Sequence, residues 1–315
     1  MYAFDSRIRY SETDSEGYLT LDALLNYFQD CSTFHSEDVG LGIGYMKEIG
    51  QVWVLSSWQI VVNRYPKLGE KVKIVTLPYE LKVFLGYRNF AMLDEKGEYI
   101  AIMGESGSGK TTLLNILAAL DKPTGGKVLL DGADIAKLKE KETAKFRRDN
   151  LGFVFQEFNL LDTFTVRDNI LLPLVLMGMS YGEMEKKLMP AAEKLGITHL
   201  LDKYPYEISG GQKQRTAAAR AMITEPKLLL ADEPTGALDS KASDELLAVF
   251  SKLNSEGQTI LMVTHSVKAA SHANRVLFIK DGEVFHQLYR GNCTNEELYK
   301  KISDTLTIIA SGGAV

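Results

Sequence analysis

A phosphate-binding loop set between an apolar strand and a helix constrains the fold of this chain more than any other feature. Residues 104–112 read Gly-Glu-Ser-Gly-Ser-Gly-Lys-Thr-Thr and follow the apolar run Tyr99–Met103. Glycine lets successive backbone N–H groups turn toward one anion without a Cβ clash. In this spacing Lys110 reaches the β- and γ-phosphates, and the Thr111 hydroxyl binds Mg²⁺. The sequence therefore predicts a nucleoside triphosphate site lined by Gly104, Ser106, Gly107, Ser108, Gly109, Lys110, Thr111 and Thr112.

Length and composition exclude several classes of protein. The 315 residues leave room for two domains, and a net charge of −5 without Lys and Arg clusters argues against nucleic-acid binding. Cys31 and Cys293 form no disulfide framework or metal spacing, which indicates a reducing cytoplasm. The N-terminus lacks the apolar core of a signal peptide. The apolar run Ile170–Met177 is shorter than the roughly 20 residues of a membrane span. Work at a membrane would therefore require a partner that spans it.

The residue pattern changes near residue 98. Before it, a strand over 4–11 and a helix from about Leu21 precede runs of β-branched and aromatic residues, which is an α+β pattern. The strands expected in those runs cover 52–62, 71–77 and 84–93, and the cluster Gly40–Gly44 is expected to be a loop. After residue 98, strands alternate with helices as in a nucleotide-binding α/β domain. We expect strands at 128–130, 228–231, 259–263 and 275–279, and helices over 136–149 and most of 166–200.

A second acidic element strengthens the nucleotide-site prediction. The apolar run Leu228–Ala231 ends in Asp232 and Glu233. At the end of a buried strand, the first carboxylate suits Mg²⁺ and the second can take a proton from an attacking water or orient it. Together with the phosphate loop, this pair predicts hydrolysis of the bound nucleotide.

The segment Ile208-Ser209-Gly210-Gly211-Gln212 identifies the class. It resembles the Leu-Ser-Gly-Gly-Gln signature of ATP-binding-cassette (ABC) ATPases, with Ile in place of Leu. Ser209 is suited to cap the following helix, and the two glycines expose N–H groups to an anion. The resemblance implies that this loop contacts the γ-phosphate held by the other subunit of a head-to-tail homodimer, so that two ATP molecules lie at the dimer interface.

The remaining motifs of that family follow in order, from about Gly97 to the C-terminus. Gln156 resembles the Q-loop glutamine, Ala237–Asp239 the D-loop, and His265 the switch histidine. The resemblance implies that His265 contacts the γ-phosphate and orients water with Glu233. The catalytic set it implies is Glu233, His265, Lys110 and Gln156. The Mg²⁺ ligands are Thr111, Gln156 and Asp232, and Ser209, Gly210, Gly211, Gln212 and Asp239 join the ATP contacts.

The implied fold is an α/β P-loop NTPase of ABC type, with a RecA-like core and a helical subdomain at about 157–207. Gly236 after the acidic pair resembles exporters of the antimicrobial-peptide or the lipoprotein-release-like branch, and the tail 285–313 is similar to the antimicrobial-peptide (bacitracin-type) resistance branch. The family resemblance implies an ATPase subunit that drives a separate membrane permease, near whose coupling helix Phe158–Phe164 would lie. Such a subunit is cytoplasmic and peripheral at the inner face of the plasma membrane. ABC proteins that do not transport usually carry two cassettes, and this chain has one.

Residues 1–97 resemble a different family, the bacterial acyl-acyl-carrier-protein thioesterases. The resemblance rests on Arg9–Gly17, on a central helix over Leu21–Glu37, on Trp53–Trp58 and on Gly86–Phe90. It implies the N-terminal part of a hotdog fold, in which a sheet wraps a long helix. Asp14 matches a catalytic carboxylate of related thioesterases. Because the second hotdog repeat that carries the catalytic groups is missing, we expect Asp14 to be a turn residue.

The two resemblances meet at Asp94–Ala101, so we expect a chimera of a partial hotdog segment (1–97) and a cassette (98–315) that lacks its usual opening strands. Strand Gly86–Leu93 is a candidate to replace one of those strands, and Tyr79 is a candidate to stack on adenine. Two alternatives remain open from the sequence. One is an acyl-ACP thioesterase-like protein of fatty acid biosynthesis with an accessory ATPase, and the other is an inactive chimeric product.

Overall fold

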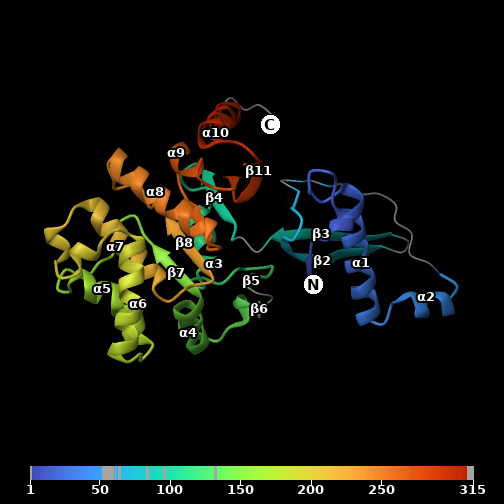
Figure 1. Ribbon diagram of the computed structural model, residues 1–315, viewed down its shortest axis with the longest axis horizontal. Helices are drawn as coiled ribbons and strands as arrows, with labels where there is room; N and C mark the ends of the chain where they lie inside the picture. The colour runs from blue at the N-terminus through green and yellow to red at the C-terminus, as the bar shows by residue number, and fades with distance from the viewer. Residues whose placement is uncertain are drawn as a thin grey trace. The chain divides into compact units, whose positions relative to one another are not determined.

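The chain folds as two units, Met1–Glu95 and Lys96–Val315 (Figure 1). The computed structural model describes residues 2–51, 60, 62, 65–82, 85–94, 97–130 and 133–310. Trp53, Trp58 and most of the strand expected over 52–62 lie outside the described residues, as does the side chain of Tyr79.

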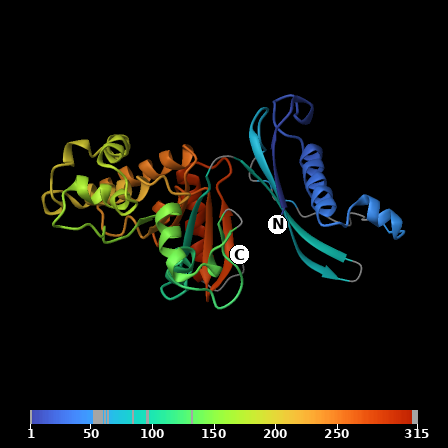
Figure 2. The ribbon, with the colours of Figure 1, turned by 90° about the horizontal axis from the view of Figure 1, so that it is seen from below.

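The first unit is a helix packed on an antiparallel sheet in the order β1-β2-β3 (Figure 2). Its strands are β1 (Tyr2–Arg7), β2 (Lys71–Lys82) and β3 (Leu85–Asp94). Helix α1 (Leu21–Asp38) confirms the predicted central helix, and it begins after Thr20, whose hydroxyl accepts a hydrogen bond from Ala23 N at 3.3 Å. The core between helix and sheet includes Leu24, Phe28, Cys31 and Ile74. This arrangement fits a partial hotdog.

Three predictions in this unit need correction. The strand expected over 4–11 ends at Arg7, because Glu12 turns back to accept a hydrogen bond from Arg9 N at 2.7 Å and a 3-10 turn (Tyr10–Glu12) forms. The Gly40–Gly44 loop ends early, since α2 (Ile43–Glu48) begins inside it, with the Glu37 carboxylate accepting from Ile43 N at 2.8 Å. The hypothesis that Gly86–Leu93 joins the cassette sheet is wrong, because β3 pairs with β2.

The second unit is built on a six-stranded sheet in the order β11-β10-β4-β9-β8-β7. The strands are β4 (Tyr99–Gly104), β7 (Leu151–Val154), β8 (Leu228–Asp232), β9 (Thr259–Val263), β10 (Arg275–Lys280) and β11 (Glu283–Tyr289). All neighbours pair in parallel except β10 and β11, which are antiparallel. The predicted strands at 99–103, 228–231, 259–263 and 275–279 are confirmed, whereas β7 and β11 were not predicted.

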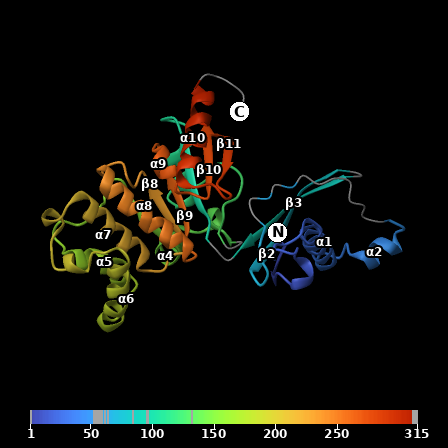
Figure 3. The same cartoon turned by 45° about the horizontal axis from the view of Figure 1, so that its top comes forward.

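The parallel strands are mainly apolar because helices cover both faces of the sheet. On β4, Tyr99, Ala101 and Met103 point into one apolar core, and Ile102 points into another. The helices are α3 (Lys110–Leu117), α4 (Glu140–Asn150), α5 (Val166–Leu176), α6 (Tyr181–Lys194), α7 (Gly210–Met222), α8 (Ser240–Ser255), α9 (Val267–Ala270) and α10 (Asn295–Ala310). Helix α8 lies against β9, and α5, α6 and α7 contact one another (Figure 3). The predicted helical stretch 166–200 is thus confirmed.

Two local features complete the second unit. The helix expected over 136–149 begins only at Glu140, because a short hairpin, β5 (Leu129–Leu130) and β6 (Ala133–Asp134), leads into a 3-10 turn capped by the Asp134 side chain. Gly97 enters the unit under tight packing. A Cβ there would lie 2.3 Å from the Gln258 carbonyl carbon and 2.4 Å from Thr259 N, and Asn254 Nδ2 donates to Gly97 O at 2.6 Å. Within the described residues, no helix is long and apolar enough to cross a membrane.

Candidate functional site

The phosphate loop connects β4 to α3 in the way that its glycines require. Gly107 has a φ of +82° and Gly109, the N-cap of α3, a φ of +96°, so both occupy the left-handed region that favours glycine. At Gly104, a Cβ would lie 2.3 Å from the carbonyl oxygen of Ile279 and 2.7 Å from Ser108 Oγ. The loop therefore follows a path that only glycine permits at these three positions.

Lys110 is held inside this loop and is only 6% exposed. Its Nζ donates to the carbonyl oxygens of Gly104 at 2.9 Å and Glu105 at 2.6 Å. Thr111 and Thr112, in the first turn of α3, are exposed, so their hydroxyls are accessible at the positive end of the helix. A buried ammonium, free helix-terminal N–H groups and exposed hydroxyls together make an anion-binding site.

A carboxylate cluster forms where β8 and β9 end. Glu233 has a left-handed backbone, with a φ of +44°, and its Oε2 accepts hydrogen bonds from His265 N at 3.1 Å and Thr264 Oγ1 at 3.2 Å. Its Oε1 is buried, has no hydrogen-bond partner among the described residues, and lies 3.4 Å from His265 Nε2. Because a left-handed non-glycine residue is costly, the surrounding contacts hold this side chain in place.

The neighbouring Asp232 belongs to the same electrostatic cluster as the phosphate loop. Burial raises the pKa of the Asp232 carboxyl, while the charges of Lys110 and His265 act in the opposite direction. These three predicted site residues, from β8, α3 and the end of β9, are therefore brought together. Among the described residues no group of three His, Cys, Asp or Glu side chains is arranged to hold a metal ion. A cation here would thus need hydroxyl, amide or phosphate ligands as well.

Gln156 lies beside the turn that follows β8. A Cβ on Gly236 would lie 3.0 Å from both Cδ and Nε2 of Gln156, so the glycine allows this close approach. The Gln156 side chain is exposed. Two residues of α7, Gln214 and Arg220, donate hydrogen bonds to the backbone on either side of Gln156, and the sequence analysis did not single them out. Their partners are 59 and 62 residues away, so no local pattern signals them.

The signature residues form the capped start of α7. Ser209 Oγ accepts from Gln212 N at 3.3 Å, and Gln212 Oε1 accepts from Ser209 N at 2.9 Å, which makes a capping box. Gly211 packs so closely on α8 that a Cβ there would lie 2.7 Å from Ala242 Cβ. Asp239 caps α8 by accepting from Ala242 N at 2.8 Å. The signature and Asp239 thus lie side by side.

The signature and the phosphate loop are not joined within one chain. In the part of the chain that the structure describes, no hydrogen bond links residues 209–212 to residues 104–112. Ser209 and Gly210 are exposed, and so is Asp239. The predicted site residues therefore fall into two groups. One surrounds Lys110 and Glu233, and the other lies at the exposed starts of α7 and α8.

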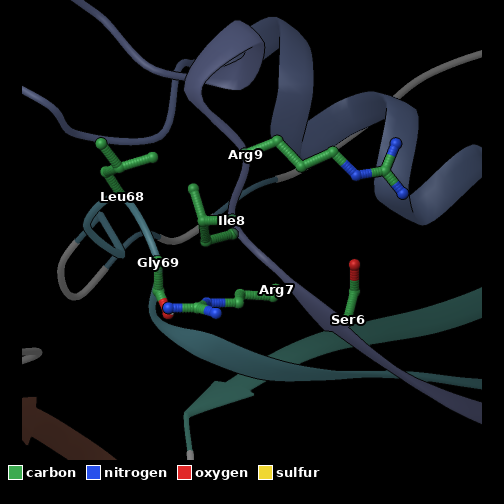
Figure 4. A pocket seen from close by; sticks show the side chains of 6 residues that line it. All are labelled: Ser6, Arg7, Ile8, Arg9, Leu68 and Gly69. Atoms are coloured by element: carbon green, nitrogen blue, oxygen red, sulfur yellow. The ribbon is translucent and has the colours of Figure 1, made fainter.

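The first unit has a hollow of its own, lined by Ser6, Arg7, Ile8, Arg9, Leu68 and Gly69 (Figure 4). Arg7 extends along it and donates from Nε to the Gly69 carbonyl oxygen at 2.8 Å. Asp14 is not among the lining residues. Its Oδ1 accepts from the backbone N–H groups of Glu16 and Tyr18, both at 2.9 Å, as a turn residue does.

Comparison with known proteins matches both parts of the chain. The family model described as ABC transporter matches residues 87–236, and the model described as acyl-ACP thioesterase N-terminal domain matches residues 1–106. The bacitracin export ATP-binding protein BceA of Halalkalibacterium halodurans is 51% identical over 216 residues, which is 68% of this chain and 85% of that protein. The two family models overlap over the stretch that contains the expected join.

Solved structures match the second part. The dimeric structure of the ABC transporter cassette MJ0796, of Methanocaldococcus jannaschii, has a TM-score of 0.57 and 39% identity, covering 69% of this chain and 98% of that one. A second dimeric structure of the same cassette, in a post-hydrolysis state with ADP and Pi, matches with the same values.

Proposed function

The chain belongs to the ABC transporter family and is an ATP-binding, ATP-hydrolysing exporter subunit, and from this premise we propose that two copies close around two ATP molecules. The division of the site residues into two groups supports the proposal. The phosphate loop of one copy binds the nucleotide, and the exposed start of α7 in the second copy contacts its γ-phosphate through Ser209 and Gln212. The capping box leaves the N–H groups of Gly210 and Gly211 directed at the same anion.

Nucleotide binding begins at Lys110 in this proposal. Its ammonium exchanges its bonds to the Gly104 and Glu105 carbonyl oxygens for bonds to the β- and γ-phosphates. The N–H groups of the loop and the first turn of α3 surround the same phosphates. Ser106, Gly107, Ser108, Gly109, Thr111 and Thr112 complete this side of the site.

A magnesium ion fits the donors near the γ-phosphate. The Thr111 hydroxyl, the Gln156 amide and the Asp232 carboxylate offer the oxygen ligands that Mg²⁺ prefers, and one carboxylate with the phosphates matches its usual sites. When bound, Mg²⁺ neutralises charge that develops on the phosphates. The partly buried Asp232 carboxylate supports this assignment, because burial disfavours its charge and a cation would offset that cost.

Hydrolysis is assigned to Glu233, and the observation that carries the assignment is its unpartnered Oε1. This oxygen is buried, accepts no hydrogen bond from any described residue and lies 3.4 Å from His265 Nε2. We assign to it the proton of the attacking water, while His265 orients that water and contacts the γ-phosphate. Oε2 keeps the carboxylate fixed through Thr264 and the His265 backbone.

The partner is proposed to be a separate membrane permease, and the exported substrate a peptide antibiotic or a lipid-like molecule. Similarity to a protein named for bacitracin export supports the peptide class. Leu161 and Phe164, in the stretch assigned to permease docking, are 43% and 38% exposed, so both apolar side chains are accessible to a partner. Such a subunit works in the cytoplasm at the inner face of the plasma membrane.

The first unit is proposed to be a partial hotdog appendage, with domains at 1–97 and 98–315. Asp14 serves a turn, and the hotdog part resembles only the N-terminal domain of its family, so we assign it no thioesterase activity.

Release of inorganic phosphate from Mg-ATP by the purified full chain tests the proposal. Wild type should hydrolyse ATP, and Lys110→Ala should abolish it. Lys187→Ala, which removes a surface ion pair to Glu225, is the matched control and should retain wild-type activity. A wild-type chain that binds no ATP would refute the proposal and favour an inactive product.

A further inference from the structure

Gln214, on α7, links the backbones next to two residues of the hydrolytic site. It is fully buried, and its Nε2 donates to the Phe155 carbonyl oxygen at 3.0 Å and to the Pro234 carbonyl oxygen at 2.7 Å. Phe155 directly precedes Gln156, and Pro234 directly follows Glu233. One amide group therefore sets the spacing between the start of the Q-loop, taken here as Phe155–Asn159, and the turn that carries the general base Glu233.

Arg220, further along α7, holds the other end of the same loop. Its guanidinium donates to the Phe158 carbonyl oxygen at 2.9 Å and to the Asn159 carbonyl oxygen at 2.5 Å. Phe158 and Asn159 have left-handed backbones, with φ values of +61° and +49°. Such residues persist only where their surroundings hold them. Arg220 supplies that restraint.

The environment of Arg220 is unusual for a charged side chain. Burial lowers the pKa of its guanidinium, and among the described residues no carboxylate forms an ion pair with Arg220. Its neighbour on α7, Arg215, instead pairs with Glu245 on α8 at 2.5 Å. Within the described residues, the Arg220 guanidinium therefore bonds to the peptide carbonyl oxygens of Phe158 and Asn159, a placement suited to holding backbone.

We infer that Gln214 and Arg220 are positioning residues that carry any movement of α7 to Gln156 and Glu233. The inference rests on the proposed function, because a second cassette would contact α7 at Ser209–Gln212. A helix moves as a rigid rod, and the two side chains are six residues, or about 9 Å, apart along it. A shift at the start of α7 thus reaches both ends of the Q-loop and the turn after Glu233.

Gln214→Leu and Arg220→Met test the inference in the full chain, with Arg220→Lys as the conservative variant and Arg215→Met as the matched control. Steady-state kinetics give kcat and KM for Mg-ATP, and hydrogen exchange reports local protection. A misplacement of about 1 Å costs on the order of a hundredfold in rate. We therefore expect kcat to fall between tenfold and a hundredfold, with KM within about threefold, because the phosphate loop is untouched.

The other readouts separate positioning from general destabilisation. Amide exchange should accelerate over 155–164 and stay unchanged over 104–112. On a logarithmic scale, the fall in kcat for Arg220→Lys should be at most half of the fall for Arg220→Met. Arg215→Met should keep the wild-type kcat whatever its melting temperature.

Two results would overturn the inference. One is a wild-type kcat in Gln214→Leu and Arg220→Met, and the other is an equal loss of kcat in Arg215→Met. If Arg220→Met does not fold, an Arg220→Lys variant with unchanged kcat and unchanged exchange overturns it as well. A wild-type chain without ATP hydrolysis would instead contradict the proposed function.

Discussion

Glu233→Gln isolates the charge of the proposed general base from its shape. The amide oxygen can still accept the bonds from His265 N and Thr264 Oγ1, at 3.1 and 3.2 Å, so the left-handed backbone at φ +44° keeps its restraints. What disappears is the proton acceptor at the unpartnered Oε1. The free energy of unfolding should therefore change by less than about 1 kcal/mol, the size of one net hydrogen bond.

The catalytic effect should be much larger. A positioned general base contributes about 10²–10⁴-fold to a rate. At 1.36 kcal/mol for each factor of ten, its loss corresponds to about 3–5 kcal/mol of activation free energy. Phosphate release at saturating Mg-ATP measures this loss. Size exclusion in the same buffer should show an ATP-dependent dimer, because binding is retained while hydrolysis is blocked.

Glu225→Gln is the control for this prediction. Glu225 also has a left-handed backbone, with a φ of +54°, and its exposed carboxylate pairs with Lys187 at 2.7 Å. The control therefore removes a charge from a residue of the same backbone conformation outside the predicted site. It should leave the rate unchanged. A Glu233→Gln chain that retains more than a third of the wild-type rate would refute the assignment of Glu233 as the base.

Three further predictions concern pH and stability. Burial raises the pKa of Asp232 above its ordinary 3.8, so the stability that this group contributes is present below pH 3.8 and is lost as pH rises through the raised pKa. Calorimetry should therefore give Asp232→Asn a higher melting temperature than wild type at pH 7. The same variant should lose Mg-dependent ATP hydrolysis. Burial, then Arg290, lowers the pKa of His272 below 6.5, so its contribution is present above pH 6.5 and is lost as pH falls through the lowered pKa. His272→Gln should make the melting temperature less dependent on pH below pH 6.5. A variant whose melting temperature falls with acid as steeply as that of wild type would contradict this prediction. Ile74 and Phe250 are fully buried in the first and second unit, respectively. Replacing either with Ala should lower the free energy of unfolding of its own unit by about 2–5 kcal/mol. A single calorimetric transition that both variants shift equally would refute independent unfolding of the two units.

The elements that the sequence predicted well are those with a local physical cause. The central strands of the second unit, such as Leu228–Ala231, are continuous apolar runs because both faces of the sheet are buried. The phosphate loop is readable because its backbone path excludes side chains at Gly104, Gly107 and Gly109. The predicted helix start near Leu21 also has a local cause, because the Thr20 side chain caps α1.

The features that escaped prediction depend on distant partners. Edge strand β11 carries exposed residues along much of its length, including Val284 and Phe285, so its pattern lacks the apolar run of its neighbours. The roles of Gln214 and Arg220 are hydrogen bonds to backbone about 60 residues away. The pairing of β3 with β2, rather than with the cassette sheet, is a choice between two partners that an alternating strand pattern fits equally.

The packing around Gly97 has a consequence for how such a gene can be inherited. No side chain fits between this residue and the backbone of Gln258 and Thr259, and Asn254 holds its carbonyl oxygen. A recombination event that preserves this packing must therefore leave a glycine codon at position 97. Selection for the packing of the second unit thus keeps glycine at this position, whatever sequence precedes it.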